Sequence, residues 1–257
     1  MFKFYTIPDV DLLQNIIGTN RTLKFSSAFN LNDPFELKFN LSLDPAAEGQ
    51  IEEFMKVHPQ STEKDFKEWQ DQVTDNDGFL WYTEQTQRAT LSKMVTLSSF
   101  TEVNDNNLMW SHYSNNHKGI CVEYTNKLFE HLKRTEGFLA FDKVSYSEEP
   151  PTVESLEPMA IKVKKMLFNK QLEWKYEKEN RVVLLSDKDT DYIPIQPEHI
   201  KAVYIGSKAS KEVTGHSVDI CRNFGFECYY GISLGKTYKV TFQKHSETTM
   251  YMRTFWN

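Results

Sequence analysis

The residues best suited to chemistry lie between Lys170 and Arg181, just before the apolar run at 182–185. In an extended chain Glu177, Glu179 and Arg181 point to the same side, because successive side chains alternate between the two faces of a strand. Two carboxylates on one face repel each other, and the pKa of one rises unless cations intervene. We expect Lys170 or Arg181 to pair with these carboxylates. The alternative is a solvated charged edge before a buried strand.

A second cluster gathers aromatic and polar side chains over Trp110–Gly119, where a short helix is expected to turn into a strand. Such corners often face ligands, since their side chains leave a rigid scaffold. His112 and His117 are five residues apart, which is not the i, i+4 spacing that puts two metal ligands on one helix face. No metal is therefore expected here. The cluster is either a ligand-binding corner or a structural one, with Trp110 in the core.

The loop at 32–36, Asn32-Asp33-Pro34-Phe35-Glu36, holds turn-forming residues and two carboxylates. It is either a tight turn anchored by Phe35 or a loop whose Asp33 or Glu36 joins the site. Ser98 and Ser99, on a strand expected over 94–100, add hydroxyls that could bind an amide or a phosphate. We also expect the 110–119 corner to lie beside the strand that starts near Arg181, because both are unusually rich in polar and aromatic side chains.

Short strands and helices are interspersed along the chain, which predicts an α+β (mixed α/β) fold with a largely antiparallel sheet flanked by helices. We expect a single domain over 1–257, with a helical insertion or lid at 47–93. Near the end we expect a hairpin around Gly235, followed by an aromatic segment, Met250–Trp256, that packs down. The other expected strands cover 2–6, 23–27, 119–124, 138–146, 180–185 and 202–205, and the expected helices include 105–114 and 210–223.

The composition is that of a globular protein, with 257 residues, 39% hydrophobic and 26% charged. A net charge of −6 gives no sign of a general nucleic-acid coat. Three scattered cysteines indicate a reducing, cytoplasmic location rather than a disulfide framework. We see no targeting segment, no membrane span, and no phosphate-binding loop, dinucleotide fingerprint or nucleophile elbow.

Several of these motifs together resemble an uncharacterised bacterial and phage family, a domain of unknown function, from Tyr5 to about Gly206. This resemblance brings no established activity. Its motifs are Asn32-Asp33-Pro34-Phe35-Glu36, Trp110-Ser111-His112-Tyr113, His117-Lys118-Gly119 and Trp174-x-Tyr176-Glu177-x-Glu179-x-Arg181.

Glu177-Lys178-Glu179 before an apolar strand is also similar to the E-x-E motif of ADP-ribosyltransferases. That resemblance implies that Glu179 stabilises the oxocarbenium-like state formed from NAD and that Glu177 positions the acceptor. Ser98 and Ser99 resemble the family's Ser-Thr-Ser strand. Tyr5 and Thr6 fall where the family has a first-strand Arg or His, so His112 would have to compensate.

The leading hypothesis is therefore ADP-ribosyl transfer or NAD glycohydrolysis in phage–host conflict, with NAD as substrate. Trp110, His112 and Tyr113 would stack on and orient the ligand, and His117, Lys118 and Arg181 would help to bind it. Asn32, Asp33, Glu36, Lys170 and Trp174 would complete the site. The alternatives are a non-enzymatic nucleotide- or protein-binding module, and a nuclease with a divalent ion among Asp33, Glu36, Glu177 and Glu179.

Overall fold

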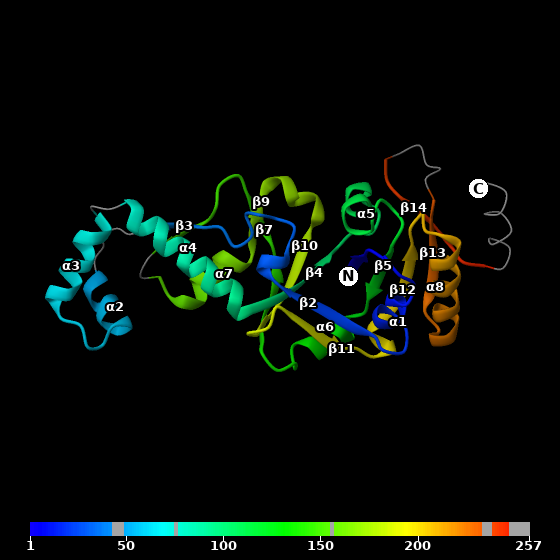
Figure 1. Cartoon of the computed structure of the whole chain (residues 1–257), viewed down its shortest axis with the longest axis horizontal. Coiled ribbons are helices and arrows are strands. Elements are labelled where there is room, and N and C mark those ends of the chain that lie inside the picture. Colours follow the sequence, from blue (N-terminus) through cyan, green and yellow to red (C-terminus); the bar gives the residue numbers. More distant parts are fainter. Residues whose placement is uncertain (43–48, 75–76, 155–156, 233–237, 247–257) are drawn as a thin grey trace.

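The computed structural model describes residues 1–42, 49–74, 77–154, 157–232 and 238–246. Within them ten strands form one sheet in which every pair except β12–β13 is antiparallel (Figure 1). The expected α+β fold with a largely antiparallel sheet is confirmed. In spatial order the strands are β11 (Thr190–Pro194), β2 (Thr22–Ser27), β4 (Val95–Thr101), β1 (Phe2–Tyr5), β5 (Ile120–Tyr124), β12 (Ile200–Ile205), β13 (Glu227–Ile232) and β14 (Thr241–Lys244), with β10 (Glu179–Leu185) and β6 (Phe138–Lys143) branching from β4.

The sheet divides at β4. One edge of β4 is paired along its whole length with β10, from Glu179 opposite Thr101 to Leu185 opposite Val95. The other edge is shared: β2 pairs with its beginning at Leu97 and β1 only with its end at Thr101. From there β1 continues along β5 and β2 along β11. A gap therefore opens between β1 and β2, with the middle of β4 at its base.

Helices cover both faces of the sheet. On one face α1 (Leu12–Ile16), α6 (Asn126–Leu132) and α8 (Lys211–Phe224) pack on the largest apolar cluster, which includes Leu13, Leu128, Val182 and Val218. The left-handed residue Gly225 (φ 75°) ends α8. On the other face α5 (Asn107–Tyr113) buries Trp110 against Phe4. No helix in the described part of the chain is long and apolar enough to cross a membrane.

The described residues within 49–93 are largely helical. They contain α2 (Gln50–Val57), α3 (Glu63–Thr74) and all but the last residue of α4 (Asp77–Met94), and these helices extend to one end of the molecule in Figure 1. Phe54, Phe66 and Trp69 form a small aromatic cluster between α2 and α3. On α4, Arg88 donates hydrogen bonds to the carbonyls of Pro34 and Glu36. This helical arm therefore holds the 32–36 loop in place.

Shorter elements connect these parts. Two small parallel pairs are formed by β3 (Asn40–Ser42) with β8 (Thr152–Glu154) and by β7 (Ser145–Ser147) with β9 (Asn169–Gln171). Helix α7 (Met159–Leu167) precedes β9, and Lys170 lies in β9. The strand expected over 138–146 is broken into β6 and β7. Strands β13 and β14 form the expected hairpin, but Gly235 and Met250–Trp256 lie outside the described residues.

Candidate functional site

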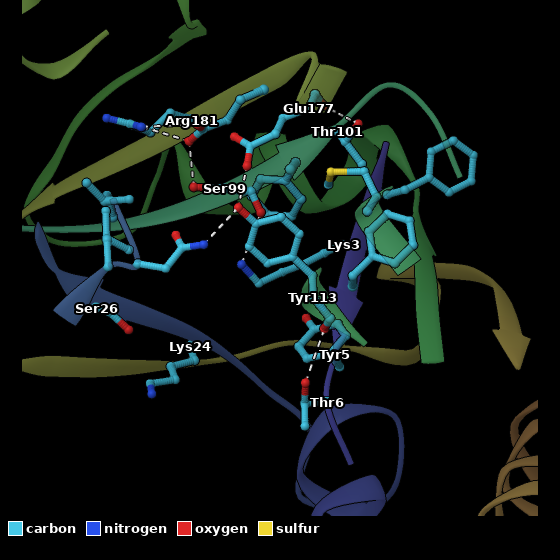
Figure 2. A pocket seen from close by; sticks show the side chains of 18 of the residues that line it. Lys3, Tyr5, Thr6, Lys24, Ser26, Ser99, Thr101, Tyr113, Glu177 and Arg181 are labelled. Atoms are coloured by element: carbon cyan, nitrogen blue, oxygen red, sulfur yellow. Dashed lines mark hydrogen bonds and ion pairs between the residues drawn. The ribbon is translucent and has the colours of Figure 1, made fainter. Parts of the chain in front are cut away.

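A cavity of about 470 Å³ occupies the gap between β1 and β2 (Figure 2). Its walls come from segments far apart in the sequence, because both strands diverge from β4 and several loops close over that point. The polar lining includes Lys3, Tyr5 and Thr6 from the first segment, Asn15 from α1, Thr22, Lys24 and Ser26 from β2, Asn32 and Glu36 from the loop, Ser99 and Thr101 from β4, Tyr113, Lys170, Glu177, Glu179 and Arg181, and Tyr192 from β11.

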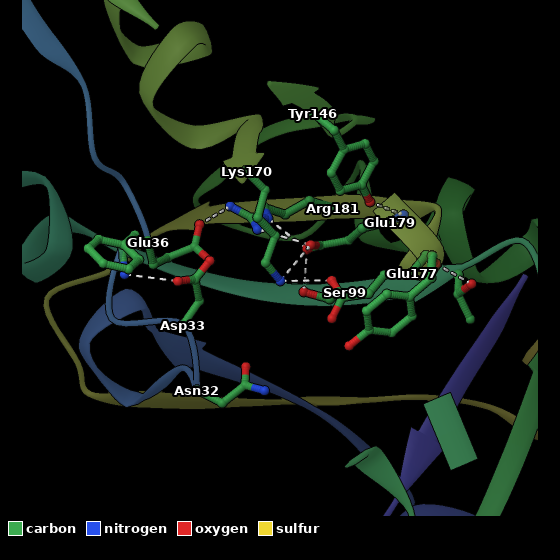
Figure 3. A network of polar contacts seen from close by, with 12 residues as sticks. Asn32, Asp33, Glu36, Ser99, Tyr146, Lys170, Glu177, Glu179 and Arg181 are labelled. Carbon is green, nitrogen blue, oxygen red and sulfur yellow. Dashed lines mark hydrogen bonds and ion pairs between the residues drawn. The ribbon is translucent and has the colours of Figure 1, made fainter. Parts of the chain in front are cut away.

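One wall of the cavity is a buried ionic network centred on Arg181 (Figure 3). The Arg181 guanidinium donates to both oxygens of Glu179, from Nε at 2.8 Å and from Nη2 at 3.1 Å. Its Nη1 also donates to Glu36 Oε1 at 2.6 Å and to the Leu167 carbonyl at 2.6 Å. Ser99 Oγ donates to Glu179 Oε1 at 2.5 Å. The alternative of a solvated edge is wrong, since Arg181 is fully buried and Glu179 is 3% exposed.

Glu177 also lines the cavity, but from a backbone conformation that differs from the expected extended strand. It ends a short 3₁₀ helix, η2 (Leu172–Glu177), and is not part of the strand. Lys178 then takes a left-handed conformation (φ 44°), which turns the chain before β10 begins. The expectation that Glu177 shares an extended strand with Glu179 and Arg181 is therefore wrong. The turn nevertheless brings both carboxylates to one wall.

Lys170 is the cation that joins the two carboxylates. Its Nζ lies 2.7 Å from Glu177 Oε2 and 3.5 Å from Glu179 Oε2, and it stacks 4.7 Å from the ring centroid of Trp174. The expected pairing of Lys170 or Arg181 with these carboxylates is thus confirmed, since Lys170 pairs with both and Arg181 pairs with Glu179. Three carboxylates, counting Glu36, face two cations, so these buried groups hold one excess negative charge when all are ionised.

The two carboxylates differ in their electrostatic environment. Burial by itself would raise the pKa of Glu179, but the charges of Arg181 and Lys170 outweigh it and lower that pKa to about 2. Burial raises the pKa of Glu177, although Lys170 opposes this effect. The Tyr113 hydroxyl donates to Glu177 Oε1, and Asn32 Nδ2 donates to that hydroxyl at 3.2 Å. Glu179 is held ionised, whereas Glu177 is the more easily protonated of the two.

The aromatic corner lies beside this wall, as expected, because Tyr113 touches Glu177 and His112 Nδ1 lies 2.8 Å from the Tyr176 hydroxyl. Gly119 lets the corner approach β1: a Cβ atom there would lie 1.9 Å from the carbonyl oxygen of Tyr5. Trp110, however, is fully buried, and its Nε1 donates to the Asn104 carbonyl at 2.6 Å. It packs in the core and offers no face to a ligand.

The structure gathers ten of the predicted residues around one cavity and leaves seven outside its lining. Ser98 is buried on the opposite face of β4 from Ser99, since side chains alternate along a strand. Asp33 is buried and forms a turn by accepting from the backbone N–H of Phe35 at 2.9 Å. The ten are Tyr5, Thr6, Asn32, Glu36, Ser99, Tyr113, Lys170, Glu177, Glu179 and Arg181; the seven are Asp33, Ser98, Trp110, His112, His117, Lys118 and Trp174.

Sequence reasoning missed Lys3 of β1 and the polar side chains of β2 that line the cavity. Lys3 lies on the first strand and donates to the Ser99 carbonyl at 3.0 Å. Lys3 lines the cavity, whereas His112 is exposed and lies outside the lining. The sequence pattern could have identified Lys3, because Lys3 and Tyr5 alternate with the apolar Phe2 and Phe4 and so belong to the polar face of the strand.

Comparison with known proteins adds one finding. Residues 109–182 match a family model described as "Protein of unknown function (DUF2971)". This segment covers the corner from Met109, the Glu177 and Glu179 pair, and the first half of β10. It supports the expected resemblance to an uncharacterised domain family. No curated protein and no solved structure matches the chain.

Proposed function

We propose that the cavity binds NAD and cleaves the bond between nicotinamide and ribose, passing ADP-ribose to water or to an acceptor. The observation that carries this proposal is the convergence of Glu177, Glu179 and Ser99 on one cavity wall, with Lys170 between the two carboxylates. These are the groups that the similarity to ADP-ribosyltransferases singles out. Lys3, two residues before Tyr5 on the first strand, adds a cation to the cavity.

The charge balance supports this reaction. In the reaction the bond from ribose C1′ to the pyridinium nitrogen breaks, its electron pair leaves with neutral nicotinamide, and positive charge develops on the ribose. The network's excess negative charge would stabilise that charge as it forms. A water or acceptor oxygen then bonds to C1′ and gives its proton to a carboxylate.

The contacts favour Glu177 as the carboxylate that meets the developing cation. Both oxygens of Glu179 already bind Arg181, so its charge is largely compensated within the protein. Glu177 is held by the single cation Lys170 and by the neutral Tyr113 hydroxyl. In this proposal Glu179 is a positioning residue that fixes Lys170 and, through it, Glu177. This reverses the roles that the E-x-E similarity assigns.

The two alternative functions make different demands. A nuclease would need several carboxylates around one ion, whereas here Lys170 and Arg181 lie between the carboxylates. Among the described residues no three His, Cys, Asp or Glu side chains are grouped to hold a metal. A binding module needs the cavity alone and predicts that a nucleotide binds without being cleaved.

The test is to incubate the protein with NAD and measure free nicotinamide by chromatography. We expect nicotinamide release by the natural protein and a loss of about 10²–10³-fold in rate for Glu177→Gln, the scale for losing an electrostatic stabiliser. Glu173→Gln is the matched control, because Glu173 is exposed in the same 3₁₀ segment. NAD binding without nicotinamide release would favour the binding module and overturn the proposal.

A further inference from the structure

The β2 wall of the cavity carries three polar side chains that the buried ionic network does not use. Thr22, Lys24 and Ser26 line the cavity, while Leu23 and Phe25 between them are fully buried in the core. These three positions form the polar face of a strand whose other face is apolar. Within the described part of the chain, the side chains of Thr22, Lys24 and Ser26 make no hydrogen bond or ion pair with the protein. Figure 2 shows Lys24 and Ser26 of this strand beside the cavity.

Lys3 reaches into the same gap from β1. Its Nζ donates to a neutral carbonyl, that of Ser99, and no described carboxylate lies within ion-pair distance of it. Burial lowers the pKa of Lys3 to about 8; Glu179 opposes this effect, and the charge of Lys24 adds to it. Two ammonium groups thus line one cavity, and neither forms an ion pair with a described carboxylate, which is an electrostatic setting that favours a bound anion.

The other two cations of the cavity are not available for this role. Arg181 and Lys170 are bound to the buried carboxylates at 2.6–2.8 Å. The cavity is therefore polarised: its carboxylate wall carries the excess negative charge, and its β1–β2 wall carries unpaired positive charge together with two hydroxyl groups.

We infer that the gap between β1 and β2 is a phosphate-binding subsite, formed by Lys3, Lys24, Thr22 and Ser26, and that the substrate is a pyrophosphate-bearing nucleotide rather than a bare riboside. The inference about the substrate rests on the proposed function, because the carboxylate wall would hold the reacting ribose. The subsite itself stands on the β1 and β2 side chains alone. Hydroxyl and ammonium donors are the groups that bind phosphate oxygens in proteins.

The subsite is tested with inorganic pyrophosphate and inorganic phosphate, by titration calorimetry at low ionic strength. We expect pyrophosphate to bind more tightly than phosphate and to weaken as salt is added. Lys24→Gln should weaken pyrophosphate binding by about tenfold, as expected for a lost charge-assisted contact at a partly exposed site. Lys24 is exposed, so this change leaves the core intact. Lys211→Gln, an equal charge change at the exposed start of α8, should leave binding unchanged.

The results separate this inference from the proposed reaction. Absent pyrophosphate binding, or equal binding by Lys24→Gln and Lys211→Gln, would overturn the subsite even if NAD is cleaved. Binding that depends on Lys24, together with no release of nicotinamide from NAD, would establish the subsite and refute the reaction. If both hold, NAD should be cleaved more efficiently than nicotinamide riboside, and Lys24→Gln should reduce that preference by raising KM.

Discussion

Replacing Glu179 by Gln should destabilise the protein by about 3 kcal/mol at pH 7. The change keeps the volume but leaves the fully buried Arg181 with Glu36 as its remaining carboxylate partner. Two independent estimates give this loss of about 3 kcal/mol in the free energy of unfolding. Lowering the pKa of Glu179 from 4.5 to about 2 corresponds to about 3 kcal/mol. Breaking a buried ion pair by removing one partner costs about 3–5 kcal/mol.

The sign of the pH dependence follows from the same pKa. Because the folded pKa of Glu179 is depressed, its contribution to stability is present above about pH 4.5 and is lost as the pH falls towards 2. At pH 3 about 2 kcal/mol of it should be gone. Urea unfolding of the natural protein, Glu179→Gln and Glu173→Gln at pH 7 and pH 3 measures this. At pH 7 the melting temperature of Glu179→Gln should fall by roughly 6–12 °C.

Two results would refute this reasoning. Glu179→Gln as stable as Glu173→Gln at pH 7 would mean that the Arg181 pair contributes nothing. A stability gap between Glu179→Gln and the natural protein that is as large at pH 3 as at pH 7 would mean that the carboxylate charge is not its origin.

Three further substitutions test single contacts. Lys170→Met removes the cation beside Glu177, so the pKa of that carboxyl should rise and the acidic limb of the nicotinamide-release profile should move to higher pH; an unmoved limb would contradict the pairing. Tyr113→Phe removes one donor to Glu177 and should shift the same limb in the same direction by less, with a stability loss of about 1 kcal/mol in urea unfolding. Lys3→Met should abolish a rise in stability between about pH 8 and 10.5, because the depressed pKa of Lys3 makes the unfolded chain bind more protons there; an identical rise in the variant would place Lys3 in solvent.

Local patterns predicted the elements that carry the site. Alternation of apolar and polar residues located β1, and β-forming or apolar runs located β4 and β10. Like-charge repulsion predicted that cations accompany Glu177 and Glu179. These inferences succeeded because each depends on residues close in sequence or on charge balance alone. The alternation over residues 2–6 also places Lys3 on the face opposite Phe2 and Phe4. Lys3 could therefore have been predicted from the sequence as a polar residue of β1 that faces away from the apolar side.

Other features depend on long-range packing that no local pattern encodes. Arg181 bonds Glu36 across 145 positions of sequence, and the gap between β1 and β2 exists because both strands compete for one edge of β4. The prediction that Glu177 lies in the strand was wrong because a single left-handed residue, Lys178, separates Glu177 from the strand. Lysine rarely adopts that conformation, so nothing in the sequence indicated it. The prediction that Trp110 stacks on a ligand was wrong, because a tryptophan at a helix-to-strand turn can face either the core or a ligand and the sequence does not distinguish the two.

The most direct measurement compares nicotinamide release from NAD by Glu177→Gln, Glu179→Gln and Glu173→Gln at saturating NAD, alongside their melting temperatures. If Glu177 meets the developing cation, Glu177→Gln loses about 10²–10³-fold in rate. Glu179→Gln loses both stability and rate, and Glu173→Gln matches the natural protein. A Glu177→Gln protein that releases nicotinamide as fast as Glu173→Gln, or a natural protein that releases none, would contradict the account.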